Sequence, residues 1–397
     1  MTPLDSLWLF FSSLLVACLI CGIGLIGSGA IRFKNAVSLQ FQTLFAFCLI
    51  TLLWFLTGHK IAFGKSCLGL FGMPYYPAEG APSGNYSPAF ILFQAMFAST
   101  SAAVILGSTA ERARLRFLAL FLPLWVLAVY SPVAHWIWNR EGWLAGLGAV
   151  DFAGGLVVHL SAGTSALVLS SMLGRRADYF NLRAPSDLTS IYVGTFLVLI
   201  GWTGFNGGSA FAWNQQAMDA VVATVLAGMS GALAWLAVEL LYPLRRPTLT
   251  GVSYGLISAL VAVTPSAGYL GFRAPILIGA IASIVCFYSI HVMNKLFKRD
   301  DPLEVFTSHG VAGLLGALIT PLLADPTRLR ASGVQFTSAQ SMFLANLLGG
   351  MIVMAYSAAI SWLLVLVLKR WAPLRATARQ EDIGLDLSFH GEKVRNG

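Results

Sequence analysis

Residues 151–163 read Asp-Phe-Ala-Gly-Gly-Leu-Val-Val-His-Leu-Ser-Ala-Gly, an apolar stretch that opens on an acid and carries a histidine eight residues later. The same spacing returns at Asp301 and His309. An ionisable side chain within a long apolar stretch is costly in a membrane, so its presence points to function. These two stretches therefore guide both the prediction of the fold and the search for a site.

The chain as a whole has the composition of an integral membrane protein. It is 57% hydrophobic and 11% charged, with a mean hydropathy of +0.75, whereas a soluble domain carries about 25% charged residues. Eleven stretches with little or no charge are each about as long as the 20 residues that a helix needs to cross hydrocarbon. They are 7–31, 36–58, 88–110, 117–138, 152–174, 188–208, 220–243, 252–270, 274–294, 305–324 and 338–368. The sequence has no long alternation of apolar and polar residues, as the strands of a membrane β-barrel would require. We therefore predict an all-α polytopic membrane protein with eleven transmembrane helices.

Internal similarity predicts two inverted halves. Glycine-rich segments at 22–29 and 201–208 end the first and sixth stretches, and the two acid–histidine pairs belong to the fifth and tenth. Both matches are five helices apart, and a unit with an odd number of helices places its copies in opposite orientations. We expect halves at about 7–174 and 188–324, with 338–368 as an appended eleventh helix. The alternative for the glycines is simple close packing of helices.

The basic residues predict the orientation in the membrane. If the loop after the first stretch is inside, thirteen Lys and Arg lie on the inner side and six on the outer side, which places the N-terminus outside and the C-terminus in the cytoplasm. The inner set is Arg32, Lys34, Arg112, Arg114, Arg116, Arg175, Arg176, Arg183, Arg245, Arg246, Lys295, Lys298 and Arg299. This topology accounts for the net charge of +8 without a nucleic-acid partner. The first stretch is interpreted as a retained helix and not as a signal peptide, because no basic residue precedes it.

Several classes of site are not expected. Of the five cysteines, Cys67 alone falls in a predicted outer loop and the others fall in apolar stretches, so neither a disulfide framework nor a metal-ligand spacing is present. No phosphate-binding loop, metal cluster or nucleophile triad stands out. We therefore expect no cofactor, no metal and no catalytic residue, and we predict that the protein is not an enzyme.

The two histidines form the first candidate site. Imidazoles donated by two inverted halves would meet near the pseudo-twofold axis, and each neutral ring has one donor and one acceptor nitrogen. A pair can share a proton, present polar edges to an otherwise apolar channel and pass a proton near neutral pH. The alternative for His159 or His309 alone is a histidine that bridges helices, and the matched spacing favours the pair.

An acid, two aromatic rings and a hydroxyl form the second candidate site. Asp151 can cap the fifth helix, which is compatible with favouring a cation nearby. Trp138 ends the fourth stretch, Phe205 lies in the glycine-rich end of the sixth, and Ser209 follows it. Trp138 with a nearby Phe would attract a small cation by about 0.5–2 kcal/mol. The alternative is an interfacial aromatic belt with core packing.

These segments resemble the Amt/Mep/Rh ammonium transporter family, and most closely its bacterial Amt branch. The specific match is 151–163 running on to Leu173-Gly-Arg-Arg176, and 308–313 is similar to the second histidine motif of the family. Shorter matches at 93–97, 110–112, 134–138, 201–206 and 300–302 follow in the family's order over nearly the whole chain. The resemblance implies eleven helices, an outer N-terminus and a homotrimer with one pore per subunit in the bacterial inner membrane. It also implies a membrane domain at 1–371.

The resemblance assigns a role to each outer candidate. Phe97, Trp138 and Ser209 would form the site that recruits ammonium from outside. Asp151 would stabilise this recruitment region.

It also assigns roles within the pore. Phe97 and Phe205 would be stacked rings that gate the pore, and His159 and His309 would be its histidine pair. One departure stands out, because the branch usually has Phe-Tyr where this chain has Ile26-Gly27. The loss of two rings beside the pore would affect substrate range and rate more than the fold.

The tail at 372–397 resembles the cytoplasmic C-terminus of Amt proteins. The matching segments are Gly384-Leu-Asp386 and His390-Gly-Glu392. In that branch the tail helps to dock a PII signalling protein, which the resemblance therefore implies as a regulator. The alternative is a solvated flexible tail.

The expected function is ammonium transport. An intact cation cannot enter an apolar pore cheaply, so ammonium would be deprotonated at the outer site and ammonia would pass the histidines. Separate transfer of the proton would make the transport electrogenic. The alternatives are an Rh-like electroneutral channel for ammonia or carbon dioxide, and an ammonium sensor.

Overall fold

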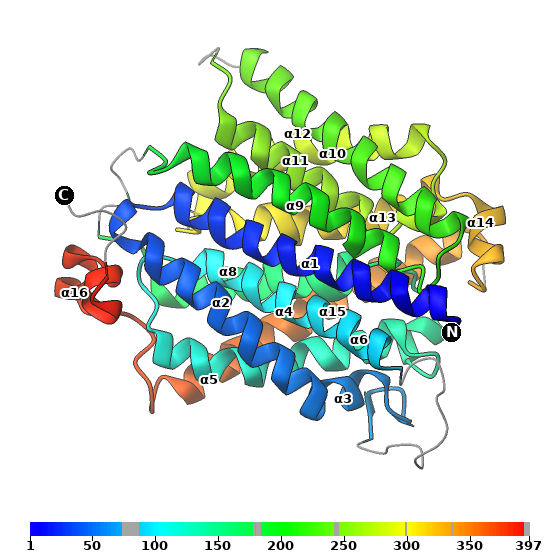
Figure 1. Cartoon of the computed structure of the whole chain (residues 1–397), viewed down its shortest axis with the longest axis horizontal. Helices are drawn as coiled ribbons and strands as arrows, with labels where there is room; N and C mark the ends of the chain where they lie inside the picture. The colour runs from blue at the N-terminus through cyan, green and yellow to red at the C-terminus, as the bar shows by residue number, and fades with distance from the viewer. Residues whose placement is uncertain are drawn as a thin grey trace.

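The computed structural model describes residues 1–73, 87–177, 179, 184–241, 246–297, 300–334 and 337–392. Its helices form a bundle in which the N-terminus and the C-terminal helix α16 (Ala378–Ile383) lie at opposite ends (Figure 1). We call the end with the N-terminus the outer end and the end with the C-terminal tail the inner end, after the predicted orientation. Four of the basic residues used for that prediction lie outside the described residues; they are Arg183, Arg245, Lys298 and Arg299.

The elements follow one another along the chain with a single short hairpin among the described residues. They are α1 (Pro3–Ala30), η1 (Phe33–Asn35), α2 (Ala36–Leu53), η2 (Trp54–Gly58), α3 (His59–Phe63), β1 (Ser66–Cys67), β2 (Phe71–Gly72), α4 (Pro88–Thr109), α5 (Leu115–Trp125), η4 (Val126–Tyr130), α6 (Ser131–Trp138), α7 (Trp143–Gly146), η5 (Gly155–Leu160), α8 (Ser161–Leu173), α9 (Leu188–Gly208), α10 (Gln215–Leu241), α11 (Leu249–Val263), η6 (Ala267–Tyr269), α12 (Arg273–Val292), η7 (Met293–Phe297), η8 (Phe306–Val311), α13 (Ala312–Leu323), α14 (Pro326–Ala331), α15 (Ala339–Leu368), α16 (Ala378–Ile383) and η9 (Asp386–His390). The antiparallel hairpin pairs Ser66 with Gly72 and Cys67 with Phe71.

The described part of the chain has ten helices that are long and apolar enough to cross a membrane. They coincide with ten of the eleven predicted stretches. The remaining stretch, 252–270, is the shorter apolar helix α11, which ends at Val263. It ends early because Pro265 has no N–H to continue the helical hydrogen bonds. The protein is therefore an all-helical membrane protein.

Glycines let the first helices of the two predicted halves approach closely. A Cβ atom at Gly22 of α1 would lie 2.7 Å from the carbonyl oxygen of Gly194 in α9, and one at Gly194 would lie 2.8 Å from the carbonyl oxygen of Gly22. The two helices run side by side through the middle of Figure 1. Small residues in membrane helices commonly allow such backbone contact.

A buried network of ion pairs joins the loops at the inner end. Arg112 contacts Asp300 at 2.8 Å, Arg176 contacts Asp300 at 2.6 Å and also Glu111, and Arg32 contacts Glu111 at 2.7 Å. Burial by itself would raise the pKa of Glu111, but the guanidinium groups of Arg176 and Arg32 outweigh burial and lower this pKa to about 2. Three separate sequence matches, at 110–112, 173–176 and 300–302, thus meet in one network.

The C-terminal tail packs on this inner end over the described residues. The backbone N–H groups of Arg114 and Ala376 donate to the carbonyls of Leu374 and Arg112, respectively. The Asp386 carboxylate accepts hydrogen bonds from the N–H groups of residues 37 and 38 and so caps the start of α2. The alternative of a solvated flexible tail is therefore wrong for the described part of this segment.

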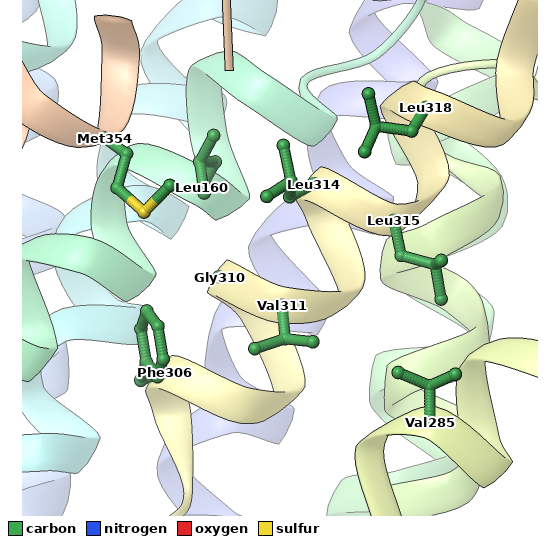
Figure 2. Close-up of a pocket in the computed structure, with 9 residues that line it drawn as sticks. All are labelled: Leu160, Val285, Phe306, Gly310, Val311, Leu314, Leu315, Leu318 and Met354. Atoms are coloured by element: carbon green, nitrogen blue, oxygen red, sulfur yellow. The ribbon is translucent and has the colours of Figure 1, made fainter. Parts of the chain in front are cut away.

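The sides of the bundle are apolar, as a lipid-facing surface requires. One groove of about 230 Å³ lies between α12, α13, α15 and the turns η5 and η8, and Figure 2 shows the residues that line it. Its lining is entirely apolar: Leu160, Val285, Phe306, Gly310, Val311, Leu314, Leu315, Leu318 and Met354. Leu160 and Gly310 follow the two candidate histidines in sequence, yet neither imidazole lines this groove.

Candidate functional site

The two histidines meet in the interior of the bundle. Their Nδ1 atoms lie 3.2 Å apart and their ring centroids 5.3 Å apart. His159 is fully buried and His309 is 9% exposed. One shared proton between the facing nitrogens makes this contact a hydrogen bond, and the tautomers decide which ring donates. The two imidazoles therefore meet in the structure, as the matched spacing of the two acid–histidine pairs predicted.

Both histidines lie in π-helical turns that begin after an acid. His159 belongs to η5 and His309 to η8, and each turn continues directly into an α-helix. Such turns inside helices are often found at functional sites. The sequence did not predict these turns, which shift the side chains relative to a regular α-helix.

A glycine four residues after each histidine lets the two helices cross in contact. A Cβ atom at Gly163 would lie 2.6 Å from the Cα atom of Gly310. A Cβ atom at Gly313 would lie 3.1 Å from the Cβ atom of His159. Any larger side chain at these positions would separate the helices, so the glycines set the distance between the imidazoles.

A stack of two phenylalanine rings lies on the outer side of the histidines. Phe97 and Phe205 are stacked with their centroids 3.8 Å apart and an angle of 15° between the rings. The centroid of the Phe205 ring lies 5.8 Å from that of His159, and the centroid of the Phe97 ring lies 5.9 Å from that of Trp138 on the outer side. The predicted gate residues are thus in contact with each other and separate the outer aromatic ring from the imidazoles.

An outer cavity of about 720 Å³ opens above this stack. Trp138, Ser209 and Asp151 line it, whereas Phe97 is 1% exposed and lies in the layer beneath. The Ser209 hydroxyl donates to the carbonyl of Phe205 at 3.0 Å, which leaves its lone pairs free to accept from a ligand. The cavity therefore combines an aromatic ring, a hydroxyl acceptor and a nearby carboxylate.

Asp151 acts on the backbone of its own segment. Its two carboxylate oxygens accept hydrogen bonds at 2.7–3.0 Å from the N–H groups of residues 154–157. Burial raises the pKa of Asp151, and these four donors counteract the rise. The carboxylate thus caps η5, the turn that carries His159. Asp151 therefore makes the cap that the sequence allowed, and the short segment that it holds runs from the outer cavity to the imidazole.

A small inner cavity of about 60 Å³ lies on the far side of the pair. His309, Trp202 and Tyr254 line it, together with Ile26 and Gly27. The two residues that depart from the usual aromatic pair therefore lie beside a histidine. A Cβ atom at Gly27 would lie 2.8 Å from Leu39 Cδ2, so Leu39 occupies part of the space that a larger side chain would need.

Trp202 is a site residue that the sequence reasoning missed. Its ring is stacked on His159 at 5.2 Å with an angle of 15° between the rings, and it lines the inner cavity. Its spacing of three residues from Phe205 places both rings on one face of α9. That spacing was available in the sequence and would have identified it.

Known proteins share this arrangement of elements over almost the whole chain. The family model described as the Ammonium Transporter Family matches residues 7–395. An ammonium transporter of Bacillus subtilis is 36% identical over 399 residues, which cover 98% of each chain. Ammonium transporter Amt1 of Archaeoglobus fulgidus is 34% identical over 386 residues, which cover 97% of each chain.

Solved structures are similar in fold as well. A protein described as a Sensor Amt Protein has a TM-score of 0.90 at 28% identity, and the match covers 98% of both chains. The crystal structure of Saccharomyces cerevisiae Mep2 has a TM-score of 0.88 at 31% identity, covering 96% of this chain and 88% of that chain. With this likeness in sequence and in fold along its whole length, the chain belongs to the ammonium transporter family, a family of membrane transporters.

Proposed function

We propose that this protein moves ammonium across the membrane by separating it into ammonia and a proton. The observation that carries the proposal is the order of the groups along one line. A cavity with Trp138 and Ser209 leads to the Phe97–Phe205 stack, then to the two imidazoles. Among the described residues, no carboxylate lies at the stacked rings or at the imidazoles, so a bare cation would be poorly stabilised there.

The outer cavity recruits the cation. The face of the Trp138 ring attracts a small cation, and the Ser209 oxygen accepts one of its N–H groups. The negative charge of Asp151 lies within the same cavity wall and adds a long-range attraction. Ammonium differs here from potassium, because it donates hydrogen bonds and can lose a proton.

The imidazole pair then conducts the two products. Ammonia is neutral and passes the stacked rings when they separate. The proton crosses separately through the facing Nδ1 atoms of His159 and His309, and this transfer makes the transport electrogenic. Because potassium has no proton to give up, the same arrangement excludes it.

The membrane arrangement is part of the proposal. We take α11 as an eleventh span beside the ten longer ones, with the N-terminus outside and the C-terminus in the cytoplasm of a bacterial cell. Two inverted halves are supported by the similar local structure of η5 and η8, because the carboxylate of the acid before each turn accepts from the N–H of the turn's first residue. A homotrimer with one pore per subunit, a membrane domain at 1–371 and a tail at 372–397 complete the arrangement.

Ammonium and potassium pulses on proteoliposomes test the function. We expect ammonium to evoke a transient current and potassium to evoke none, because deprotonation is required for passage. A potassium current equal to the ammonium current would contradict the mechanism. A pH-linked ammonium flux without current would favour the electroneutral alternative.

A sensing role is the second candidate, and the similarity to the protein described as a Sensor Amt Protein favours it. A sensor would bind ammonium at the outer cavity without passing it through the stack. Growth of transporter-deficient cells on low ammonium separates the two. Rescue by this chain supports transport, and binding without rescue supports sensing.

The inner end offers a surface for regulation by a PII-type protein. The tail is already packed against the loops that begin α2 and α5. A partner that displaces the tail would remove the Asp386 cap from α2, and so would act on the helices that surround the pore.

The departure at Ile26-Gly27 gives a prediction about the rate. The exchange Gly27→Tyr would place a ring in the inner cavity and force Leu39 and Leu303 aside, at a cost of roughly 1–3 kcal/mol in stability. We expect a severalfold loss of maximal ammonium uptake. Gly24→Ala is the matched control, since its Cβ atom would only reach ordinary contact with Thr43 at 3.4 Å. Uptake of Gly27→Tyr equal to that of the control would show that this cavity is not on the route.

A further inference from the structure

Asn346, on the eleventh predicted helix, makes three hydrogen bonds in the interior. Its side-chain oxygen accepts from the N–H of Val150 at 2.8 Å. Its side-chain nitrogen donates to the carbonyls of Val150 at 3.1 Å and Ala317 at 2.8 Å. Asn346 is fully buried. Both amide protons are therefore used, and no solvent competes for these bonds.

The bond to Ala317 fills a gap that a proline creates. In a regular α-helix the carbonyl of Ala317 would accept the N–H of residue 321. That residue is Pro321, inside α13 and without an N–H. The amide of Asn346 supplies the missing donor, and α13 is the helix that continues from the turn carrying His309.

The bonds to Val150 hold one end of the segment that builds the outer site. Three consecutive residues, 150–152, are each bonded to a different element. Val150 bonds to Asn346, the carbonyl of Asp151 accepts from Trp138 at 2.8 Å, and the N–H of Phe152 donates to the carbonyl of residue 265 at 3.0 Å. All three residues line the outer cavity. Loosening Val150 frees the backbone immediately before the carboxylate that caps η5.

We propose that Asn346 is a positioning residue for the outer site. Its amide fixes the Val150–Asp151 backbone against α13 and thereby sets the affinity for ammonium. The proposal rests on the function proposed above, and it adds a residue that touches neither the cation nor the imidazoles. It also gives the eleventh helix a role beyond completing the bundle.

The exchange Asn346→Leu tests the proposal, because leucine has the same branched side-chain shape and makes none of the three bonds. In proteoliposomes we expect the half-saturating ammonium concentration to rise roughly tenfold, equivalent to the loss of one buried hydrogen bond from the site. The maximal current should change much less. Asn346→Asp, which keeps the acceptor for the Val150 N–H, is expected to shift the half-saturating concentration in the same direction by less.

Ser361→Ala is the matched control on the same helix. It removes the 2.9 Å hydrogen bond from Ser361 to Ser165, which lies away from the outer cavity. We expect a lower unfolding temperature and an unchanged half-saturating concentration. An equal rise in that concentration for Ser361→Ala would mean that any loosening of α15 has this effect, and it would overturn the assignment to Asn346.

The exchange Pro321→Ala separates positioning from helix repair. Alanine at position 321 supplies the N–H donor that the carbonyl of Ala317 lacks. The double variant Asn346→Leu/Pro321→Ala should therefore recover stability but keep the raised half-saturating ammonium concentration. If the double variant recovers both, Asn346 only repairs α13 and the proposal fails. The same variants form a double-mutant cycle.

Hydrogen exchange provides a readout that does not depend on transport. In Asn346→Leu we expect faster exchange of the N–H groups of residues 154–157, which are bonded to Asp151, than in Ser361→Ala. Unchanged exchange at these groups would overturn the proposal even if transport occurs. Faster exchange in a protein that carries no ammonium would sink the proposed function and leave the positioning role standing.

Discussion

Replacing His159 by leucine is expected to reduce the ammonium-evoked current by about a hundredfold or more, the usual contribution of a positioned proton-transfer group. The leucine keeps the volume of the ring but removes both nitrogens. His309 then has no partner at 3.2 Å, so a proton has no relay across the apolar segment. Current and ammonia flux should be measured together in proteoliposomes, because flux of ammonia alone would persist if the two paths are separate.

His291→Asn is the control for this prediction. His291 lies on α12, another apolar helix, and its ring contacts the carbonyl of Phe287 in the same helix. It lines neither the outer nor the inner cavity. We expect the control to conduct like the unaltered protein. An undiminished current in His159→Leu would contradict the proton path through the pair.

Replacing Asp151 by alanine is expected to cost about 3–5 kcal/mol of stability, as for a buried charged group whose partners are left behind. Four N–H groups at the start of η5 would lose their acceptor together. Because η5 carries His159, the pair would lose its geometry and transport would stop. Thermal unfolding in detergent and the ammonium current both report on this change.

Asp325→Ala is the control for this prediction, because it removes a helix cap at an exposed position. Asp325 also accepts from a backbone N–H at the start of a helix, that of Thr327 at 2.8 Å, but it lies at the surface of α14. Loss of an exposed cap costs about 1 kcal/mol. If both variants unfold at the same temperature and conduct equally, the Asp151 carboxylate does not hold η5 in place.

Features that repeat in the sequence were predicted well. Apolar length identified ten long helices, because hydrocarbon thickness sets their size. The common spacing of Asp151 to His159 and of Asp301 to His309 predicted that the imidazoles meet. The family resemblance correctly brought together Phe97 and Phe205, which are 108 residues apart in sequence and in stacking contact in space.

Features that depend on a distant partner were not predicted. The π-helical turns η5 and η8 lie directly before the close contacts of the two helices at Gly163 and Gly313, and the sequence did not predict them. In the sequence, Asn346 looks like an ordinary polar residue in an apolar helix. Its role becomes visible only in the structure, where it is bonded to Val150, which is 196 residues away in the sequence. The packed tail is a further case, since its contacts are made with α2 and with the loop before α5.

The contact between Phe97 and Phe205 has a consequence for kinetics. If these rings gate the pore as proposed, a distance of 3.8 Å between their centroids leaves no room between them for even a neutral molecule. Parting such a pair forfeits roughly 0.5–1.5 kcal/mol of ring–ring attraction, a small barrier compared with stripping a cation of water. On the proposed mechanism we expect the separation of the two side chains to limit the rate of transport, so that turnover levels off at high concentration gradients and does not grow with them as in an open tube.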